Sequence, residues 1–226
     1  RKTMKFTAFN GSPAGEKSAT GRMLGAFLAG AARAGAETEL YHLGDYSIGQ
    51  CQGCFACWFR TPGQCVRHDD MEKLLRAYRS ADVVCFGSPV YSWNMTALLK
   101  NFVDRLIPLK SPLLTEQNGN FDMADAAPRQ QRFVTVSNCG FPGENNFSII
   151  RAAFSCCAPS LEIYRNCGKL LVSKQESVQE RVRAYLQAVE QAGYEFAAHG
   201  EVTAETRAQL DAQLMSAAEY VQFLGM

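Results

Sequence analysis

The sequence predicts an α/β protein with a doubly wound, parallel sheet of five strands in the order 2-1-3-4-5 and helices on both faces. Three observations support this prediction. Short apolar segments alternate with amphipathic helical segments, which is typical of right-handed βαβ units. The segment Asp82–Gly87 is continuously apolar after its first residue, as in strands buried on both faces. The loops after the first, third and fourth strands are rich in small and hydroxyl residues.

Each predicted strand is a short apolar or alternating run that ends in turn residues. The first strand ends at Asn10 and Gly11, and the second alternates polar with apolar residues. The strands are expected at Met4–Phe9, Glu37–Leu43, Asp82–Gly87, Arg132–Ser137 and within Ile163–Val172.

The helices are predicted from apolar residues that recur every three or four positions, as Met23, Phe27 and Ala31 do in the first one. Asp69 or Asp70 is suited to cap the second. The second helix is expected to run from Asp69 or Asp70 to Arg79. The others are expected at Ser18–Ala34, Met95–Leu106, Phe147–Cys157, Ser177–His199 and Thr203–Leu224. Gly44–Arg67 is expected to be a loop without helical period, and Ile107–Gln130 a polar excursion over the surface.

The last predicted helix lies beyond the core unit. We therefore expect a nucleotide-binding domain over residues 1–200 and a helical extension over residues 201–226. The apolar face of this helix must pack on its own domain or on a second subunit. That face contains Leu210, Leu214, Ala217, Tyr220 and Leu224.

Composition excludes several classes of protein. The chain has 226 residues, of which 47% are hydrophobic and 20% charged, as in soluble globular proteins. Its net charge of +1 gives no electrostatic reason to expect nucleic acid or an anionic membrane as a partner. No apolar stretch approaches the ~18 residues of a membrane span, and no signal peptide is visible. Nine cysteines without a disulfide framework favour a reducing cytoplasm.

Four cysteines lie close together with the spacing C-x2-C-x2-C-x7-C: Cys51, Cys54, Cys57 and Cys65. Thiolates hold iron–sulfur clusters, and such compact runs suit them. The spacing alone is compatible with an iron–sulfur cluster and with a set of reduced thiols that line a pocket. A zinc site is a third interpretation, although zinc favours C-x2-C pairs that are well separated in sequence.

The first loop, Asn10–Thr20, connects a strand to a helix N-terminus, where backbone N–H groups and the helix dipole favour a phosphate. Ser12, Ser18 and Thr20 add hydroxyl groups there. The loop contains neither a Walker A motif nor G-x-G-x-x-G, so a phosphomonoester fits better than ATP or a dinucleotide. The alternative is an ordinary βα turn capped by Ser18.

The other two loops favour a flat ring. The second offers Pro89, Val90, Tyr91, Ser92, Trp93 and Asn94. A fused ring can pack on this backbone near Tyr91 or Trp93, with main-chain N–H groups at its polar edge. The alternative is that both aromatic residues belong to the core or a subunit contact. The third loop offers Asn138, Cys139 and Gly140, and its glycine allows close approach of a ring. A phosphate site beside a ring platform indicates FMN.

These loops resemble those of the flavodoxin-like NAD(P)H-dependent FMN reductase family, over a region from about Met4 to Val172. GSPAGEKSAT resembles the phosphate loop of the family, SPVYSWNMTALLKNFVDR its isoalloxazine loop, and NCGFPGEN its third flavin loop. Many relatives carry a polar side chain where this chain has Ala19, so the resemblance implies a phosphate contact through the Ala19 backbone.

The cysteine run resembles that of one branch, the iron–sulfur flavoproteins. Those proteins bind a [4Fe-4S] cluster through C-x2-C-x2-C and a fourth cysteine. Cys51, Cys54, Cys57 and Cys65 fall at the matching positions, with a last gap at the long end of that pattern.

The resemblance implies an FMN-dependent oxidoreductase that takes a hydride from transiently bound NAD(P)H. Its electron acceptor is a quinone, another small molecule or a protein, reached through the cluster if one is present. No side chain is assigned a catalytic role, including His42, His68 and His199. The alternatives are a non-enzymatic, flavodoxin-type electron carrier and a zinc-binding structural module. A homodimer or a dimer of dimers is expected.

Overall fold

The computed structural model of the chain describes residues 3–126 and 130–225. Its central sheet is parallel, with five strands in the order β2-β1-β3-β6-β7. These strands are β1 (Lys5–Asn10), β2 (Glu37–His42), β3 (Val83–Pro89), β6 (Arg132–Asn138) and β7 (Leu161–Arg165). Strands β4 and β5 form a separate sheet. When the five core strands alone are numbered along the chain, their order across the sheet is 2-1-3-4-5. The predicted flavodoxin-like topology is confirmed.

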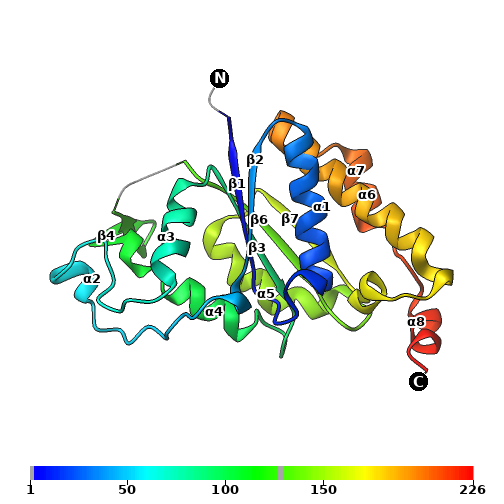
Figure 1. Cartoon of the computed structure of the whole chain (residues 1–226), viewed down its shortest axis with the longest axis horizontal. Coiled ribbons are helices and arrows are strands. Elements are labelled where there is room, and N and C mark those ends of the chain that lie inside the picture. Colours follow the sequence, from blue (N-terminus) through cyan, green and yellow to red (C-terminus); the bar gives the residue numbers. More distant parts are fainter. Residues whose placement is uncertain (1–2, 127–129, 226) are drawn as a thin grey trace.

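Helices cover both faces of the sheet (Figure 1), with α1 and α6 on one side and α3 and α4 on the other. Their bounds are α1 (Ala19–Arg33), α2 (Ala56–Phe59), α3 (Met71–Ser80), α4 (Ala97–Asp104), α5 (Ser148–Phe154), α6 (Glu176–His199), α7 (Ala204–Asp211) and α8 (Ala217–Phe223). Short 3-10 helices lie at Gly15–Lys17, Leu43–Asp45, Ile107–Leu109, Glu144–Phe147, Ser155–Cys157 and Gly168–Val172. Within the described residues, no helix has both the length and the apolar character to cross a lipid bilayer.

Strand β3 is apolar from Val83 to Gly87 because its successive side chains enter two different cores. In β3, Val83 and Cys85 pack against α1 and α6, whereas Val84 and Phe86 pack against α3, α4 and α5. All four side chains are at most 5% exposed. This two-sided burial explains why β3 shows no polar alternation in the sequence.

Helices α1 and α6 cross at two glycines. A Cβ atom at Gly30 would lie 1.8 Å from the backbone oxygen of Glu190, and one at Gly193 would lie 1.9 Å from that of Phe27. Only hydrogen fits at either position, so these glycines set how closely the two helices approach.

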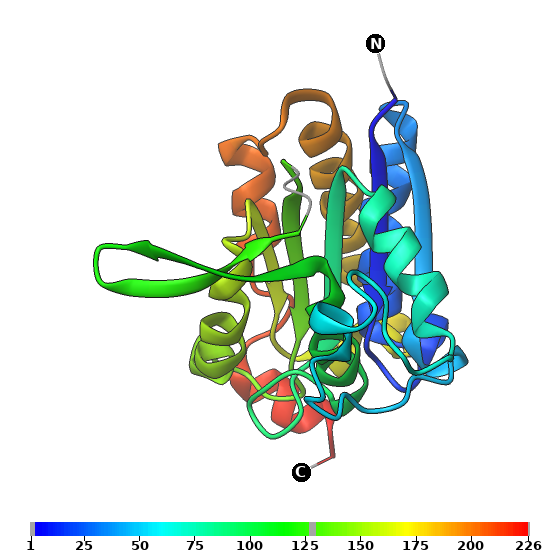
Figure 2. The same ribbon diagram turned by 90° about the vertical axis from the view of Figure 1, so that its left-hand side faces the viewer.

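The predicted excursion contains a β-hairpin, β4 (Lys110–Gln117) and β5 (Asn120–Asp125), that extends away from the body of the molecule (Figure 2). Asn118 and Gly119 join the strands, with φ angles of 53° and 77°. Positive φ at both turn residues is the type I′ geometry for which Asn-Gly is suited. The sequence prediction missed both strands. Positions 127–129 of the predicted excursion lie outside the described residues.

The prediction of one helix over Thr203–Leu224 is wrong, because this segment forms two helices, α7 and α8. Arg165, which is buried, donates hydrogen bonds to the carbonyl groups of Leu210 and Ala212 where α7 ends. Ser216 then starts α8 through a capping box with Glu219. The apolar periodicity continues across this break, which is why the sequence did not reveal it. The domain division at residue 200 stays a prediction.

The predicted loop Gly44–Arg67 contains one helical turn, α2. Gly63 N donates to the carbonyl group of Cys57 (3.0 Å), so the chain folds back after α2. Four residues are too few for a helical period to show in the sequence.

Candidate functional site at the carboxyl ends of the strands

Three loops meet where β1, β3 and β6 end. Gly11 N donates to the carbonyl oxygen of Gly87 (2.8 Å), and Thr96 Oγ1 donates to that of Gly11 (2.6 Å). Val90 N donates to the carbonyl oxygen of Asn138 (2.7 Å). These bonds join the loops into one surface at the edge where doubly wound sheets bind ligands.

The first loop closes onto the N-terminus of α1. The Ser18 hydroxyl accepts a hydrogen bond from Gly21 N (2.8 Å) and donates one to the carbonyl oxygen of Gly15 (2.6 Å). This hydroxyl therefore caps the helix. The residues that follow, Ala19 and Thr20, begin the helix, so their N–H groups belong to its first turn and have no partner within the helix. In this conformation the helix end offers backbone N–H groups to an anion.

Asn10 shapes this loop from inside. Its side chain is fully buried and donates to the carbonyl oxygen of Gly15 (3.0 Å), while its Oδ1 accepts from Ser12 N (2.9 Å). The same Nδ2 lies 3.0 Å from Nδ1 of His42, at the end of β2. Sequence reasoning assigned no role to either residue. An asparagine directly after a buried strand is the signal that could have identified Asn10.

Thr20 and Asn138 tie the first loop to the third. Asn138 Nδ2 donates to Thr20 Oγ1 (2.7 Å), and both side chains are buried. A Cβ atom at Gly168 would lie 2.7 Å from Asn138 Oδ1, so the segment after β7 closes tightly over this pair. Ser12 is also buried, at 4% exposure. The predicted polar residues therefore organise the loops beneath the surface.

The second loop is a strained turn that presents two aromatic rings. Tyr91 and Asn94 exchange two backbone hydrogen bonds, of 2.9 and 3.0 Å. Between them, Ser92 and Trp93 have φ angles of 47° and 63°. Left-handed non-glycine residues cost about 1–3 kcal/mol each and are concentrated at functional sites. Tyr91 and Trp93 are 54% and 59% exposed, which excludes them from the core of this chain.

The third loop is held by the end of the chain. The Tyr220 hydroxyl in α8 donates to the carbonyl oxygen of Gly140 (2.8 Å), a contact that the sequence did not predict. Space beside Gly140 is open, since an added Cβ would meet nothing within 4 Å. Cys139 is buried and donates to the carbonyl oxygen of Phe141 (3.1 Å). Burial raises the pKa of the Cys139 thiol to about 11, which favours a protonated, unreactive thiol.

The cysteine run lies apart from these three loops. Its four thiols line one small cavity of about 50 Å³, together with Arg105 and Ile107 but with no residue of the strand-end loops. Left-handed φ angles at Gly53 (62°) and Phe55 (52°) turn the loop around this cavity. Cys57 is buried, and burial raises the pKa of its thiol. The other three thiols, those of Cys51, Cys54 and Cys65, are exposed or half-buried.

These four cysteines suit a cluster by their chemistry. Four cysteines line one cavity, and four cysteine thiolates are the donor set of a [4Fe-4S] cluster. Within residues 3–126 and 130–225, no three His, Cys, Asp or Glu side chains converge closely enough to hold a single metal ion. A four-iron cluster separates its ligand sulfurs more widely than a single ion does. The four cysteines therefore suit a cluster by their donor type, and the described residues contain no preformed site for a single ion such as zinc.

A buried ion pair anchors both ends of the cysteine loop. Arg105 Nη1 and Nη2 bond to Asp69 Oδ2 (2.8 Å) and Oδ1 (3.1 Å). Asp69 also accepts from Gly49 N (2.9 Å) and Met71 N (3.1 Å). Burial alone would raise the pKa of Asp69, but Arg105 and these amides outweigh it, so the pKa is lowered. The sequence did not single out Arg105, because it is a basic residue within the predicted helix Met95–Leu106.

The predicted cap of α3 has a more specific form in the structure. Asp70 precedes the helix, but its carboxylate accepts from Ser47 N (2.7 Å). Asp69 accepts from Met71 N, the first residue of the helix. The two aspartates thus tie α3 to the segment before the cysteines.

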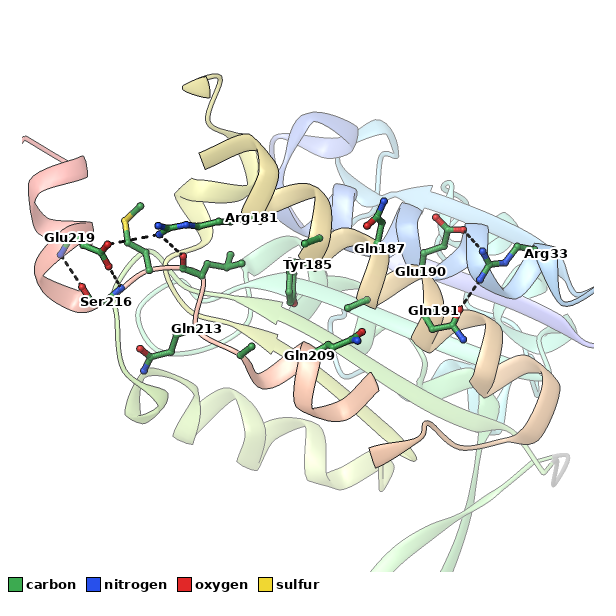
Figure 3. Close-up of a pocket in the computed structure, with 15 residues that line it drawn as sticks. Arg33, Arg181, Tyr185, Gln187, Glu190, Gln191, Gln209, Gln213, Ser216 and Glu219 are labelled. Atoms are coloured by element: carbon green, nitrogen blue, oxygen red, sulfur yellow. Dashed lines mark hydrogen bonds and ion pairs between the residues drawn. The ribbon is translucent and has the colours of Figure 1, made fainter. Parts of the chain in front are cut away.

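A larger hollow of about 1070 Å³ lies between α6 and the α7–α8 segment (Figure 3). Its charged side chains are paired with each other, as Arg33 is with Glu190 (3.1 Å) and Arg181 with Glu219 (3.9 Å). None of the predicted site residues lines it. The candidate site is therefore the surface at the strand ends.

Comparison with known proteins identifies the family of the chain. A sequence model of the NADPH-dependent FMN reductases matches residues 4–118, just over half of the chain. The chain belongs to the NADPH-dependent FMN reductase family. The matched residues contain the first two strand-end loops and the whole cysteine run, so the resemblance stated from the motifs is confirmed.

Relatives of the chain include iron–sulfur flavoproteins. The chain is 39% identical to one from Archaeoglobus fulgidus over 102 residues, which are 45% of this chain and 48% of that protein. It is 36% identical to one from Methanocaldococcus jannaschii over 107 residues, 47% of this chain and 54% of the other. The chain thus spans about half the length of the curated relatives it matches.

Solved structures agree with the fold. An NAD(P)H:quinone oxidoreductase from Methanothermobacter marburgensis has a TM-score of 0.61 at 17% identity, over 88% of this chain and 99% of that one. An FMN-dependent NADH-azoreductase from Bacillus anthracis, in complex with FMN, also has a TM-score of 0.61, at 14% identity, over 86% of this chain and 100% of that one. At these identities the likeness concerns the fold.

Proposed function

We propose that this member of the FMN reductase family is an FMN-dependent oxidoreductase that takes a hydride from NAD(P)H and passes electrons to a quinone, another small molecule or a protein. The observation that carries the proposal is the joining of three loops by hydrogen bonds at the strand ends, with a helix N-terminus beside two exposed aromatic rings. An anion site next to a flat apolar platform suits a mononucleotide with a large ring.

The proposed site divides FMN between the loops. The phosphate would lie at the N–H groups of Ala19 and Thr20, above the buried Ser12 and Ser18. The ring would pack on the second loop, and its polar edge would face main-chain groups of the second and third loops. The ring-binding residues are Pro89, Val90, Tyr91, Ser92, Trp93, Asn94, Asn138, Cys139 and Gly140. Bound FMN supplies the hydride chemistry, and the residues of the chain bind and orient it.

Spectroscopy of the purified chain tests this function. The expected result is that the chain binds FMN and that its flavin absorbance bleaches when NADH or NADPH is added without oxygen. Bound FMN that either nicotinamide bleaches only slowly would support the electron-carrier alternative. A colourless preparation that ignores added FMN would refute the proposal, and zinc in that preparation would favour the structural module.

Replacing Trp93 by Ala is expected to raise the dissociation constant for FMN about fivefold, because an aromatic pair contributes roughly 1 kcal/mol beyond its buried area. Quenching of flavin fluorescence on titration measures this constant. Phe59→Ala is the matched control, since Phe59 is also an exposed ring (73%) but lies outside the three loops. Equal affinities for Trp93→Ala and wild type would remove Trp93 from the proposed site.

We further propose that Cys51, Cys54, Cys57 and Cys65 hold a [4Fe-4S] cluster. Two facts support this assignment: the four thiols line one cavity, and the related proteins named above are iron–sulfur flavoproteins. With a cluster the protein would deliver electrons singly, and without one it would deliver them in pairs.

Replacing Cys54 by Ser is expected to remove most of the iron from anaerobically prepared protein and to leave FMN binding intact. The reason is that Cys54 belongs to the thiol cavity and to none of the FMN loops. Iron, sulfide and flavin analysis provides the measurement. Cys156→Ser, at an exposed cysteine outside the cavity, is expected to retain its iron. Iron that persists unchanged in Cys54→Ser would contradict this ligand set.

The cysteines also bear on the location of the protein. All nine are free, which supports our proposal of a reducing, cytoplasmic setting.

We propose a homodimer, or a dimer of dimers, formed through the hairpin. Leu113, Leu114 and Phe121 on the hairpin are 69–71% exposed. Near its base lies a largely apolar hollow of about 950 Å³ that the side chains of Phe86 and Phe133 help to line. Exposed apolar patches of this kind mark protein contacts.

Replacing both Leu113 and Phe121 by Ser is expected to convert the oligomer into monomers at micromolar concentration, because their apolar area drives the contact. Sedimentation velocity measures the change. Val172→Ser is the control, since Val172 is exposed (43%) but lies away from the hairpin. A wild-type chain that sediments as a monomer would refute the proposed assembly.

A further inference from the structure

A buried guanidinium borders the four-thiol cavity. Arg105 is 2% exposed and lines this cavity together with Cys51, Cys54, Cys57 and Cys65. Its Nη atoms bind Asp69, whereas its Nε is buried and has no hydrogen-bond partner. A buried N–H group without a partner is costly, and structures keep few of them.

The ion pair is oriented, with its positive end at the cavity. Arg105 lines the cavity and Asp69 does not. The Asp69 carboxylate accepts from Gly49 N (2.9 Å) and Met71 N (3.1 Å) as well as from Arg105. A guanidinium group is not deprotonated in proteins. The guanidinium therefore stays charged beside the thiols.

A second arginine provides a comparison. Arg67 also lines the cavity, but its side chain is exposed to solvent. Water and salt screen an exposed charge, whereas a charge at a buried position acts at a lower effective dielectric constant. Of these two cations, Arg105 therefore has the stronger electrostatic effect inside the cavity.

We propose that Arg105, held by Asp69, is a redox-tuning residue that stabilises the reduced state of an iron–sulfur cluster bound by the four cysteines. This inference rests on the cluster of the proposed function. Four thiolates give such a cluster a net negative charge, and reduction adds one electron without forming or breaking a bond. The donor of that electron is the reduced flavin. A fixed cation beside the cluster favours the more negative state and so raises its reduction potential.

The experiment is a potentiometric titration of the cluster in the reconstituted full chain, read by the electron paramagnetic resonance signal of the reduced cluster. Arg105→Gln is expected to lower the midpoint potential relative to wild type. Arg105→Lys, which keeps the charge, is expected to restore most of the difference. Arg67→Gln is the matched control, with a smaller shift because solvent screens that side chain.

The outcomes separate this inference from the proposed function. Wild-type protein without iron would refute the cluster, and Arg105 would lose its role with it. Iron in wild type together with an unchanged potential in Arg105→Gln would refute the role of Arg105 alone. If Arg105→Gln does not fold, the double variant Asp69→Asn/Arg105→Gln, which buries no unpaired charge, provides the same comparison.

Discussion

Replacing Asp69 by Ala is expected to lower the free energy of unfolding by about 3–5 kcal/mol, as measured by urea denaturation. The substitution leaves the Arg105 guanidinium buried without its partner and deprives the amides of Gly49 and Met71 of their acceptor. Asp104→Ala is the matched control. It removes the Lys100–Asp104 pair, whose side chains are 58% and 45% exposed, and is expected to cost less than about 1 kcal/mol. Equal losses in the two variants would contradict a special role for Asp69.

The same carboxylate makes part of the stability depend on pH. The pKa of Asp69 is lower in the folded chain than its ordinary value. Its contribution is therefore fully present above a pH of about 4, the pKa of an unfolded aspartate, and is lost as the pH falls through the lowered value. The difference in unfolding free energy between wild type and Asp69→Ala is expected to shrink over that acidic range. A difference that stays constant would show that protonation of Asp69 is not linked to folding.

Replacing Gly30 by Ala is expected to lower the free energy of unfolding by about 3 kcal/mol, which is the upper end of the usual cost of overpacking a core. The new methyl group would lie 1.8 Å from a backbone oxygen of α6, so the two helices must move apart. Because α1 carries the first strand-end loop at its N-terminus, FMN affinity is expected to fall as well. Thermal or urea unfolding and flavin titration measure the two effects.

A second glycine in the same helix provides the control. An added Cβ at Gly25 would meet nothing within 4 Å. Gly25→Ala is therefore expected to raise stability by about 0.5–1 kcal/mol, since alanine loses less conformational entropy in a helix. If both variants are stabilised, the close crossing of α1 and α6 is not rigid.

The strand-end loops were predictable because their signals are local in the sequence. A buried strand followed by small residues and a helix start identifies a βα loop, and the topology brings such loops to one edge. The hydrogen bonds that join them were not predictable. Thr20 and Asn138 are 118 residues apart, and Tyr220 reaches Gly140 from 80 residues away.

The cysteine run shows the same division. Its spacing indicated that Cys51, Cys54, Cys57 and Cys65 act together, and they do line one cavity. The sequence did not single out Arg105, because a basic residue in an amphipathic helix is ordinarily exposed. Its burial depends on Asp69, which lies 36 residues earlier in the chain.

Pattern and spacing were sufficient for the order of the core strands, the loops at their ends and the set of four thiols, since periodicity, turn residues and ligand spacing are written into neighbouring residues. Tertiary packing alone decided the break between α7 and α8, the glycine crossing of α1 and α6, and the place of Arg105 beside the thiols. Each of these depends on contacts between residues far apart in the chain, whose free energy no local pattern encodes.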